Sequence, residues 1–114
     1  MTNDSEIKIF ECLDFLRDNA KAFANAKSQR TYLDEYRKTK KALCMRDAEI
    51  KGAKSAATQE RDAYSNPEYI ELLEAIKIAV AEEERLKWLM IAAQAKIEVW
   101  RTIESSRRYE AKTI

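Results

Sequence analysis

Apolar residues between positions 86 and 103 recur at the spacing of one helix face. Successive members of one set are four, three, four and three residues apart, which is the pattern of a coiled-coil seam. This set consists of Leu86, Met90, Ala93, Ile97 and Trp100. Leu89 and Ile103 extend this seam into a broad apolar face. A face of this width needs more than one neighbouring element to cover it.

The helix that carries this face is expected to begin near residue 66. Asn66 can accept a hydrogen bond from one of the first free N–H groups, and Pro67 suits the first helical position because it has no N–H to lose. Glu68 complements the positive end of the helix dipole. No further helix breaker follows, so the sequence predicts a helix over 67–110, roughly 60 Å long at about 1.5 Å per residue.

A second helical pattern starts near the N-terminus, where the polar residues 3–5 can cap a helix. Its apolar residues recur at three and four positions and are Ile7, Phe10, Leu13, Leu16, Ala20, Phe23 and Ala24. The pair Asp18-Asn19 is the weakest point of this pattern. A break there makes residues 5–18 a separate short helix. Without a break the helix continues to Ser65-Asn66-Pro67 and ends there, because the residue before a proline is pushed out of the helical region.

These patterns predict an all-α fold in one domain that covers all 114 residues. The expected segments are an N-terminal helix, a basic helix and a C-terminal helix, over residues 1–26, 27–64 and 67–110. We expect the last two to form a long antiparallel helical hairpin that turns at 64–67. In that hairpin Ala63 lies near Tyr69, and Met45 lies near Leu86 or Lys87.

The composition agrees with a helical protein, because the chain has one Gly and one Pro, and 36% of its residues are charged. No apolar run approaches the ~20 residues that a membrane span needs. The first six residues carry acid where a targeting sequence carries base. We therefore expect a cytoplasmic protein with reduced cysteines and no membrane association.

The net charge of +1 hides a segregation of charge along the chain. Residues 27–61 contain ten basic and five acidic residues, whereas residues 62–84 contain one basic and seven acidic residues. After residue 84 there are seven basic residues against three acidic ones. One interpretation is that the basic and acidic segments complement each other across the hairpin. The other is that part of the positive charge remains for a polyanion.

Catalytic chemistry has little support in the sequence. The chain has no His, the commonest general base, and its single Gly excludes a glycine-rich phosphate loop. Consecutive helical residues point about 100° apart, so the run Glu82-Glu83-Glu84 cannot converge on one ion. We expect no enzymatic activity, no cofactor and no metal site.

The apolar residues of 86–103 outnumber those that residues 27–44 offer as a partner, so a monomer would expose them. We therefore expect a homo-oligomer. The residues expected at its interface are Leu86, Leu89, Met90, Ala93, Ile97, Trp100 and Ile103. In the alternative arrangement, the N-terminal helix folds back over this face within one chain, through Phe10, Phe15, Leu16 and Phe23.

Basic residues with interleaved tyrosines indicate a nucleic-acid surface, since Lys and Arg neutralise phosphates and tyrosine rings stack on unpaired bases. On the basic helix these residues are Tyr32, Tyr36, Arg37, Lys38, Lys40, Lys41 and Arg46. A second group near the C-terminus consists of Arg101, Arg107, Arg108, Tyr109 and Lys112. A solvated helix surface explains either group alone equally well, and repetition of both groups in an oligomer favours binding.

The order of these features is an alanine-rich stretch at 20–26, then Tyr32, a charged helix, the turn Asp62-Ala63-Tyr64-Ser65 and a C-terminal Arg107-Arg108-Tyr109. Over most of the chain this layout resembles the small helical recombination mediator proteins of bacteriophages, the UvsY type, which load a recombinase onto single-stranded DNA. The resemblance implies a ring-like homo-oligomer built through the C-terminal helices. It also implies single-stranded DNA, a recombinase and a single-strand-binding protein as partners, in the cytoplasm of a bacterial host.

In that family a Lys-x-Arg pair just before the Asp-x-Tyr turn contributes to DNA binding. This chain has Thr58-Gln59-Glu60 there, followed by Arg61. The expected DNA site is therefore Lys51, Lys54 and Arg61 together with residues 37–41.

Two other classes of function fit the same patterns. In one, the chain is a phage structural or assembly protein whose segregated charge serves subunit packing. In the other, it is a helical adaptor or inhibitor that binds another protein without nucleic acid, through the acidic segment 62–84.

Overall fold

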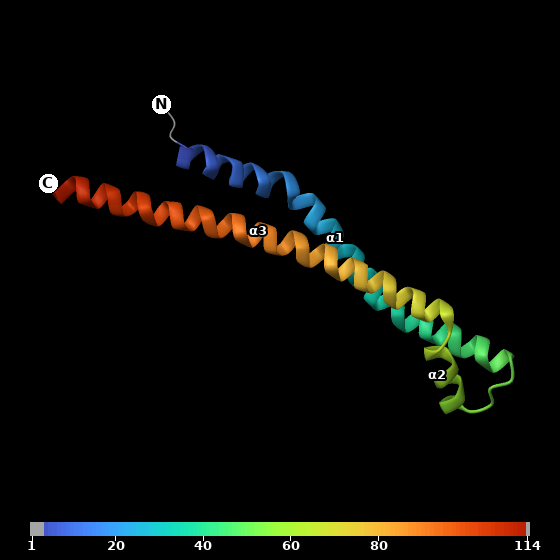
Figure 1. The fold of residues 1–114 in the computed structure, drawn as a ribbon. Helices are drawn as coiled ribbons and strands as arrows, with labels where there is room; N and C mark the ends of the chain where they lie inside the picture. Colours follow the sequence, from blue (N-terminus) through green and yellow to red (C-terminus); the bar gives the residue numbers. More distant parts are fainter. Residues whose placement is uncertain (1–3, 114) are drawn as a thin grey trace. The chain divides into compact units, whose positions relative to one another are not determined.

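The computed structural model describes residues 4–113, and within that range all regular structure is helical. The helices are α1 (Asp4–Ile50), α2 (Ala56–Tyr64) and α3 (Pro67–Thr113) (Figure 1). Helix makes up 94% of the structure, far above the ~30–35% of an average domain, so the predicted all-α class is confirmed. No helix in the described range has an apolar stretch long enough to span a bilayer.

α1 passes through Asp18-Asn19 without a break. The Asn19 side-chain amide donates to the Phe15 carbonyl oxygen at 2.9 Å, one turn earlier. This bond keeps the Asn19 side chain from competing for the backbone in a non-helical conformation. The expected division between a helix over 1–26 and a helix over 27–64 is therefore wrong.

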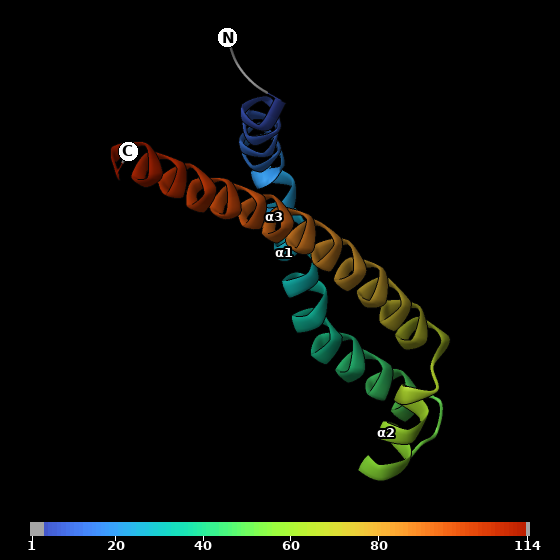
Figure 2. The ribbon, with the colours of Figure 1, turned by 60° about the vertical axis from the view of Figure 1, so that its left-hand side comes forward.

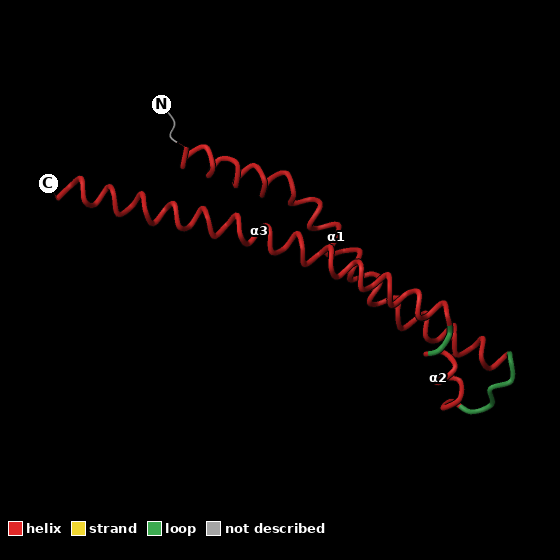
Figure 3. The backbone as a smooth tube through the Cα atoms, viewed as in Figure 1, coloured by secondary structure: helices red, strands yellow, loops and turns green. Residues whose placement is uncertain are grey.

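The expected basic helix is also wrong at its C-terminal end, because α1 ends at Ile50 and α2 begins only at Ala56. Gly52 has φ +113°, a conformation that side chains with a Cβ rarely adopt. Ser55 then starts a new helix, because its hydroxyl accepts from the Thr58 N–H at 3.1 Å while Thr58 Oγ1 accepts from the Ser55 N–H at 3.3 Å. Loops therefore join α1 to α2 and α2 to α3 (Figure 3).

The start of α3 is as predicted. Asn66 Oδ1 accepts a hydrogen bond from the Glu68 N–H at 2.9 Å, and Pro67 is the first helical residue. The Ser65 N–H donates to the Arg61 carbonyl at 3.3 Å, which closes the last turn of α2. Local capping therefore determines this helix boundary.

The structure consists of two compact units, and α1 and α3 each contribute to both. Among the described residues, unit 1 comprises 4–24 and 84–113, and unit 2 comprises 25–83. The core of unit 2 lies where α2 adjoins the end of α1 and the start of α3 (Figures 1 and 2).

Cys44 of α1, Ala63 of α2 and Tyr69 of α3 form that core, at 3%, 0% and 7% exposure. Burial raises the pKa of the Cys44 thiol. The predicted proximity of Ala63 and Tyr69 is confirmed. Met45, expected near Leu86 or Lys87, packs against this cluster, so the predicted register is wrong.

Two long-range ion pairs show that α1 and α3 run antiparallel within unit 2. Arg30 pairs with Glu83, and Lys40 pairs with Glu68. The pairing differs from the predicted register because α2, rather than a tight turn, connects the two long helices.

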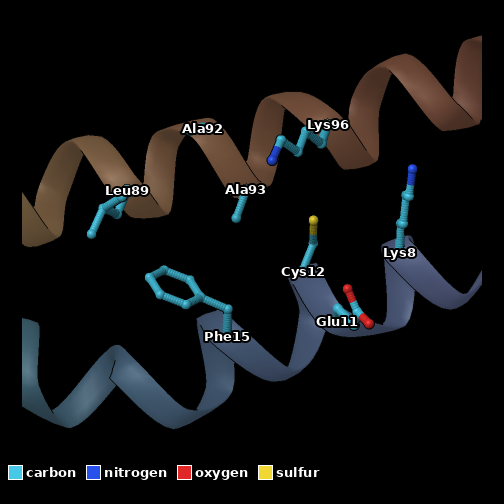
Figure 4. Close-up of a pocket in the computed structure, with 8 residues that line it drawn as sticks. All are labelled: Lys8, Glu11, Cys12, Phe15, Leu89, Ala92, Ala93 and Lys96. Carbon is cyan, nitrogen blue, oxygen red and sulfur yellow. The ribbon is translucent and has the colours of Figure 1, made fainter.

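Unit 1 contains a groove between the start of α1 and the C-terminal half of α3. Figure 4 shows Cys12 and Phe15 of α1 pointing towards α3, and Leu89 and Ala93 pointing towards α1. Within unit 1, the N-terminal part of α1 thus folds back along α3, the alternative arrangement considered above. Phe10, by contrast, is 60% exposed.

Candidate functional site

Lys41 lies at the centre of a polar cluster in unit 2. Its Nζ is 3.0 Å from Glu60 Oε1 and 4.7 Å from the centroid of the Tyr64 ring. Contact with Tyr64 and the hydrogen bond to Glu60 raise the pKa of the Lys41 ammonium. The same hydrogen bond lowers the pKa of Glu60. The cluster joins α1 to α2 through a charge-assisted hydrogen bond and a cation–π contact.

A cavity of about 420 Å³ adjoins this cluster and brings together basic and aromatic side chains. Its lining residues are Arg37, Lys38, Lys41, Tyr64 and Tyr69. We call it the Tyr64 cavity. The two tyrosine rings meet edge to face, with centroids 5.5 Å apart and planes inclined at 66°. Tyr69 is buried, whereas Tyr64 is 47% exposed.

The cations at the rim of the Tyr64 cavity have only weak partners on their own helix. Arg37 pairs with Asp34 at 3.6 Å and Lys38 pairs with Glu35 at 3.5 Å. All four side chains are well exposed. Exposed ion pairs of this kind contribute only about 0–1 kcal/mol to the stability of the folded protein. A phosphate group can therefore replace these carboxylates at little cost.

Lys40 is adjacent in sequence but is placed differently. Its Nζ is 3.1 Å from Glu68 Oε2, its side chain is 21% exposed, and it does not line the Tyr64 cavity. The hydrogen bond to Glu68 raises the pKa of Lys40. The structure thus divides the expected group 37–41 into cavity-lining cations and a cation that links α1 to α3.

Tyr32 and Tyr36 are stacked on each other, with centroids 6.0 Å apart and planes inclined at 9°. Tyr32 is 63% exposed. Because the two rings face each other, an unpaired base can stack only on the outer faces of the pair.

Lys51, Lys54 and Arg61, which the sequence placed in one site, line a second cavity of about 500 Å³ around the loop between α1 and α2. Lys51 pairs with Asp47 at 3.0 Å and Arg61 with Asp62 at 3.4 Å. Lys54 and the exposed Arg46 form no ion pair within residues 4–113. Positive charge without an ion-pair partner in the described range therefore remains on unit 2.

The C-terminal basic group belongs to unit 1. Arg107 pairs with Glu104 at 3.0 Å, and Arg101 pairs with Glu98 at 3.0 Å. Arg108 is exposed and has no carboxylate partner among the described residues. These arginines thus lie on a different unit from the Tyr64 cavity.

The residues expected at an oligomer interface are not equally accessible in unit 1. Leu86 and Ala93 are 4% and 6% exposed, while Leu89 and Ile103 are 44% and 45% exposed. The remaining residues are partly buried and are Met90, Ile97 and Trp100.

α3 also exposes apolar residues on another side of the helix, and of these Ile103 was among the residues expected at the oligomer interface. Trp88 and Val99 are 60% and 59% exposed. At about 100° per residue, Trp88 lies some 140° around the helix from the buried Ala93, and Val99 and Ile103 lie within about 60° of Trp88. We call Trp88, Val99 and Ile103 the outer face of α3.

Comparison with known protein families, with curated proteins and with solved structures finds no match for this chain. The function is therefore inferred from the chain's own residues. Within the described range, no group of three or more Cys, Asp or Glu side chains is placed to hold a metal ion.

Sequence reasoning missed Glu60 and Tyr64 as site residues, although Tyr64 was recognised as part of a turn. Glu60 lies 19 residues from Lys41, so no local pattern identifies it as a partner. The only signal was the position of Tyr64 just before Asn66-Pro67, where a turn brings it close to the next helix.

Proposed function

We propose that this chain binds single-stranded DNA through unit 2 and acts as an accessory protein in recombination, helping to load a recombinase. The Tyr64 cavity is the observation that carries the proposal. It combines three cations with exposed aromatic surface, and proteins that bind single strands without strong sequence preference use this combination. Lys51, Lys54 and Arg61 extend the basic surface around the neighbouring loop.

Self-association is part of this proposal. The outer face of α3 exposes Trp88, Val99 and Ile103, and α1 exposes Phe10 in the same unit. Large apolar side chains exposed together mark surfaces for association. A homo-oligomer built through unit 1 repeats the basic surface, so that one strand contacts several subunits and gains avidity. A recombinase and a single-strand-binding protein are the protein partners that this role requires.

Fluorescence anisotropy with a labelled single-stranded oligonucleotide, at several salt concentrations, tests the proposal. If phosphates provide the main contacts, log K falls linearly with log salt, by about 0.7 per phosphate neutralised. The double variant Arg37→Glu/Lys38→Glu should bind more weakly and flatten the slope by about 1.4. Lys8→Glu/Lys21→Glu makes the same charge change on exposed positions of α1 in unit 1 and should bind nearly as the wild type does. Undetectable wild-type binding at about 50 mM salt would overturn the proposal.

The ion pairs of unit 2 favour a second candidate function, a helical structural, assembly or adaptor protein that binds no nucleic acid. Lys40 and Lys41 are satisfied by Glu68 and Glu60, so part of the segregated charge holds the helices together. In this case light scattering still shows an oligomer, while oligonucleotide binding is absent at every salt concentration. The two measurements together separate the candidates.

A further inference from the structure

We infer that the Tyr64 cavity is a single-nucleotide subsite whose stacking surface is covered by Lys41 in the free protein. An unpaired base stacks on Tyr64 in place of the Lys41 ammonium, and the released ammonium joins Arg37 and Lys38 in contacting phosphate. This inference rests on the proposed binding of single-stranded DNA and adds the residue that selects unpaired bases.

The geometry of Tyr64 provides the stacking surface. The ring is held from one side by the edge-to-face contact with the buried Tyr69, at 5.5 Å between centroids. A ring fixed by a buried neighbour loses little side-chain entropy when a base stacks on it. Tyr64 is nevertheless 47% exposed, so a base that leaves its own stack can reach it. A duplex keeps its bases paired and stacked, and it is therefore excluded from this contact.

Lys41 competes with a base for that surface. Its Nζ lies 4.7 Å from the Tyr64 centroid, which is within the range of a cation–π contact. Glu60 holds the ammonium there through a hydrogen bond of 3.0 Å. The Lys41 side chain is 31% exposed, so it has room to turn towards solvent when a phosphate attracts it. Binding thus exchanges the Lys41–Glu60 pair for a Lys41–phosphate contact.

Lys40 provides a matched comparison on the same helix. It pairs with Glu68 at 3.1 Å, much as Lys41 pairs with Glu60, but it lies outside the cavity. Glu60→Gln and Glu68→Gln therefore remove the same charge from neighbouring pairs. Only Glu60→Gln loosens the cation that covers Tyr64.

The experiment measures the affinity of the full chain for two oligonucleotides of equal length, oligo(dT) and the corresponding abasic strand, which keeps the phosphates and lacks the bases. Tyr64→Ala should weaken binding to oligo(dT) by roughly 5- to 150-fold, the equivalent of one lost base stack, and leave binding to the abasic strand nearly unchanged. Ile78→Ala, at a 69% exposed residue of unit 2 outside the Tyr64 cavity, should change neither affinity. Circular dichroism verifies that each variant keeps its helix content.

The Glu60→Gln variant tests the covering role of Lys41. It should bind oligo(dT) more tightly than the wild type, and more tightly than Glu68→Gln does. An equal gain in affinity for oligo(dT) in Glu60→Gln and Glu68→Gln would show a general effect of net charge. That result would overturn the covering role of Lys41. If the wild type binds oligo(dT) and Tyr64→Ala loses affinity equally for both strands, or loses none, the subsite is wrong while the proposed function stands. If the wild type binds neither strand, both fail.

Discussion

Arg30 of α1 donates two hydrogen bonds to the Glu83 carboxylate of α3, from Nε to Oε2 at 2.5 Å and from Nη2 to Oε1 at 3.1 Å. The Glu83 side chain is 11% exposed and that of Arg30 is 31% exposed. Two-point pairing of this kind fixes both the distance and the orientation of the groups. It therefore determines where α1 and α3 of unit 2 meet.

Breaking this pair should destabilise the protein. Loss of one partner of a fully buried pair costs about 3–5 kcal/mol, and the partial exposure of Arg30 reduces this to about 1–3 kcal/mol for Glu83→Gln. Urea denaturation measures the free energy of unfolding. The double variant Arg30→Met/Glu83→Met should regain part of the loss, because no charge is left unpaired. The exposed ion pair between Lys38 and Glu35 supplies the control. Glu35→Gln should change the free energy of unfolding by less than about 0.5 kcal/mol.

The loop between α1 and α2 should depend on Gly52. Gly52→Ala should lower the free energy of unfolding by about 1–2 kcal/mol, because alanine at φ +113° is strained. The backbone alone is responsible, since a Cβ at this position meets no atom within 4 Å. Thermal denaturation measures the Tm of this variant. Ala53→Gly, a substitution at the next residue, serves as the comparison. A Gly52→Ala variant as stable as the wild type would show that the loop has another conformation.

The Lys41–Glu60 pair should give stability a defined dependence on pH. Its hydrogen bond lowers the pKa of Glu60 below the ordinary 4.5, so the stabilisation is present above pH 4.5 and is lost as pH falls through the lowered value. The raised pKa of Lys41 means that stabilisation is also lost as pH rises past 10.5 and through the raised value. The difference in Tm between wild type and Glu60→Gln should therefore close at both extremes. The difference in Tm between wild type and Lys41→Met should also disappear at both extremes of pH. A Tm difference that persists well below pH 4.5 would contradict this account.

The two apolar surfaces of α3 should respond differently to charge. Trp88→Glu/Val99→Glu changes exposed residues of the outer face and should dissociate the proposed oligomer while leaving helix content unchanged. Met90→Glu/Ile97→Glu changes partly buried residues and should lower the stability of unit 1 itself. Light scattering and circular dichroism distinguish these effects. A wild-type mass of 13.3 kDa at micromolar concentration would show that the chain does not associate.

Sequence alone determined the features that depend on neighbours within about one turn. Asn66 and Pro67 start α3 because capping and the missing N–H are local properties. The scarcity of Gly and Pro made the all-α class predictable for the same reason. The sequence did not show that Gly52 and the Ser55 cap together outweigh the surrounding helix formers.

Only the tertiary structure decided which charges face one another. Residues 37–41 were predicted as one basic surface, yet α2 places Glu60 beside Lys41, and α3 places Glu68 beside Lys40. Arg30 and Glu83 are 53 residues apart, and helical periodicity specifies the face of a side chain but not its partner. Tyr64 became the candidate stacking surface for the same physical reason. Its exposure depends on how Tyr69 and Lys41 pack around it, which no local pattern contains.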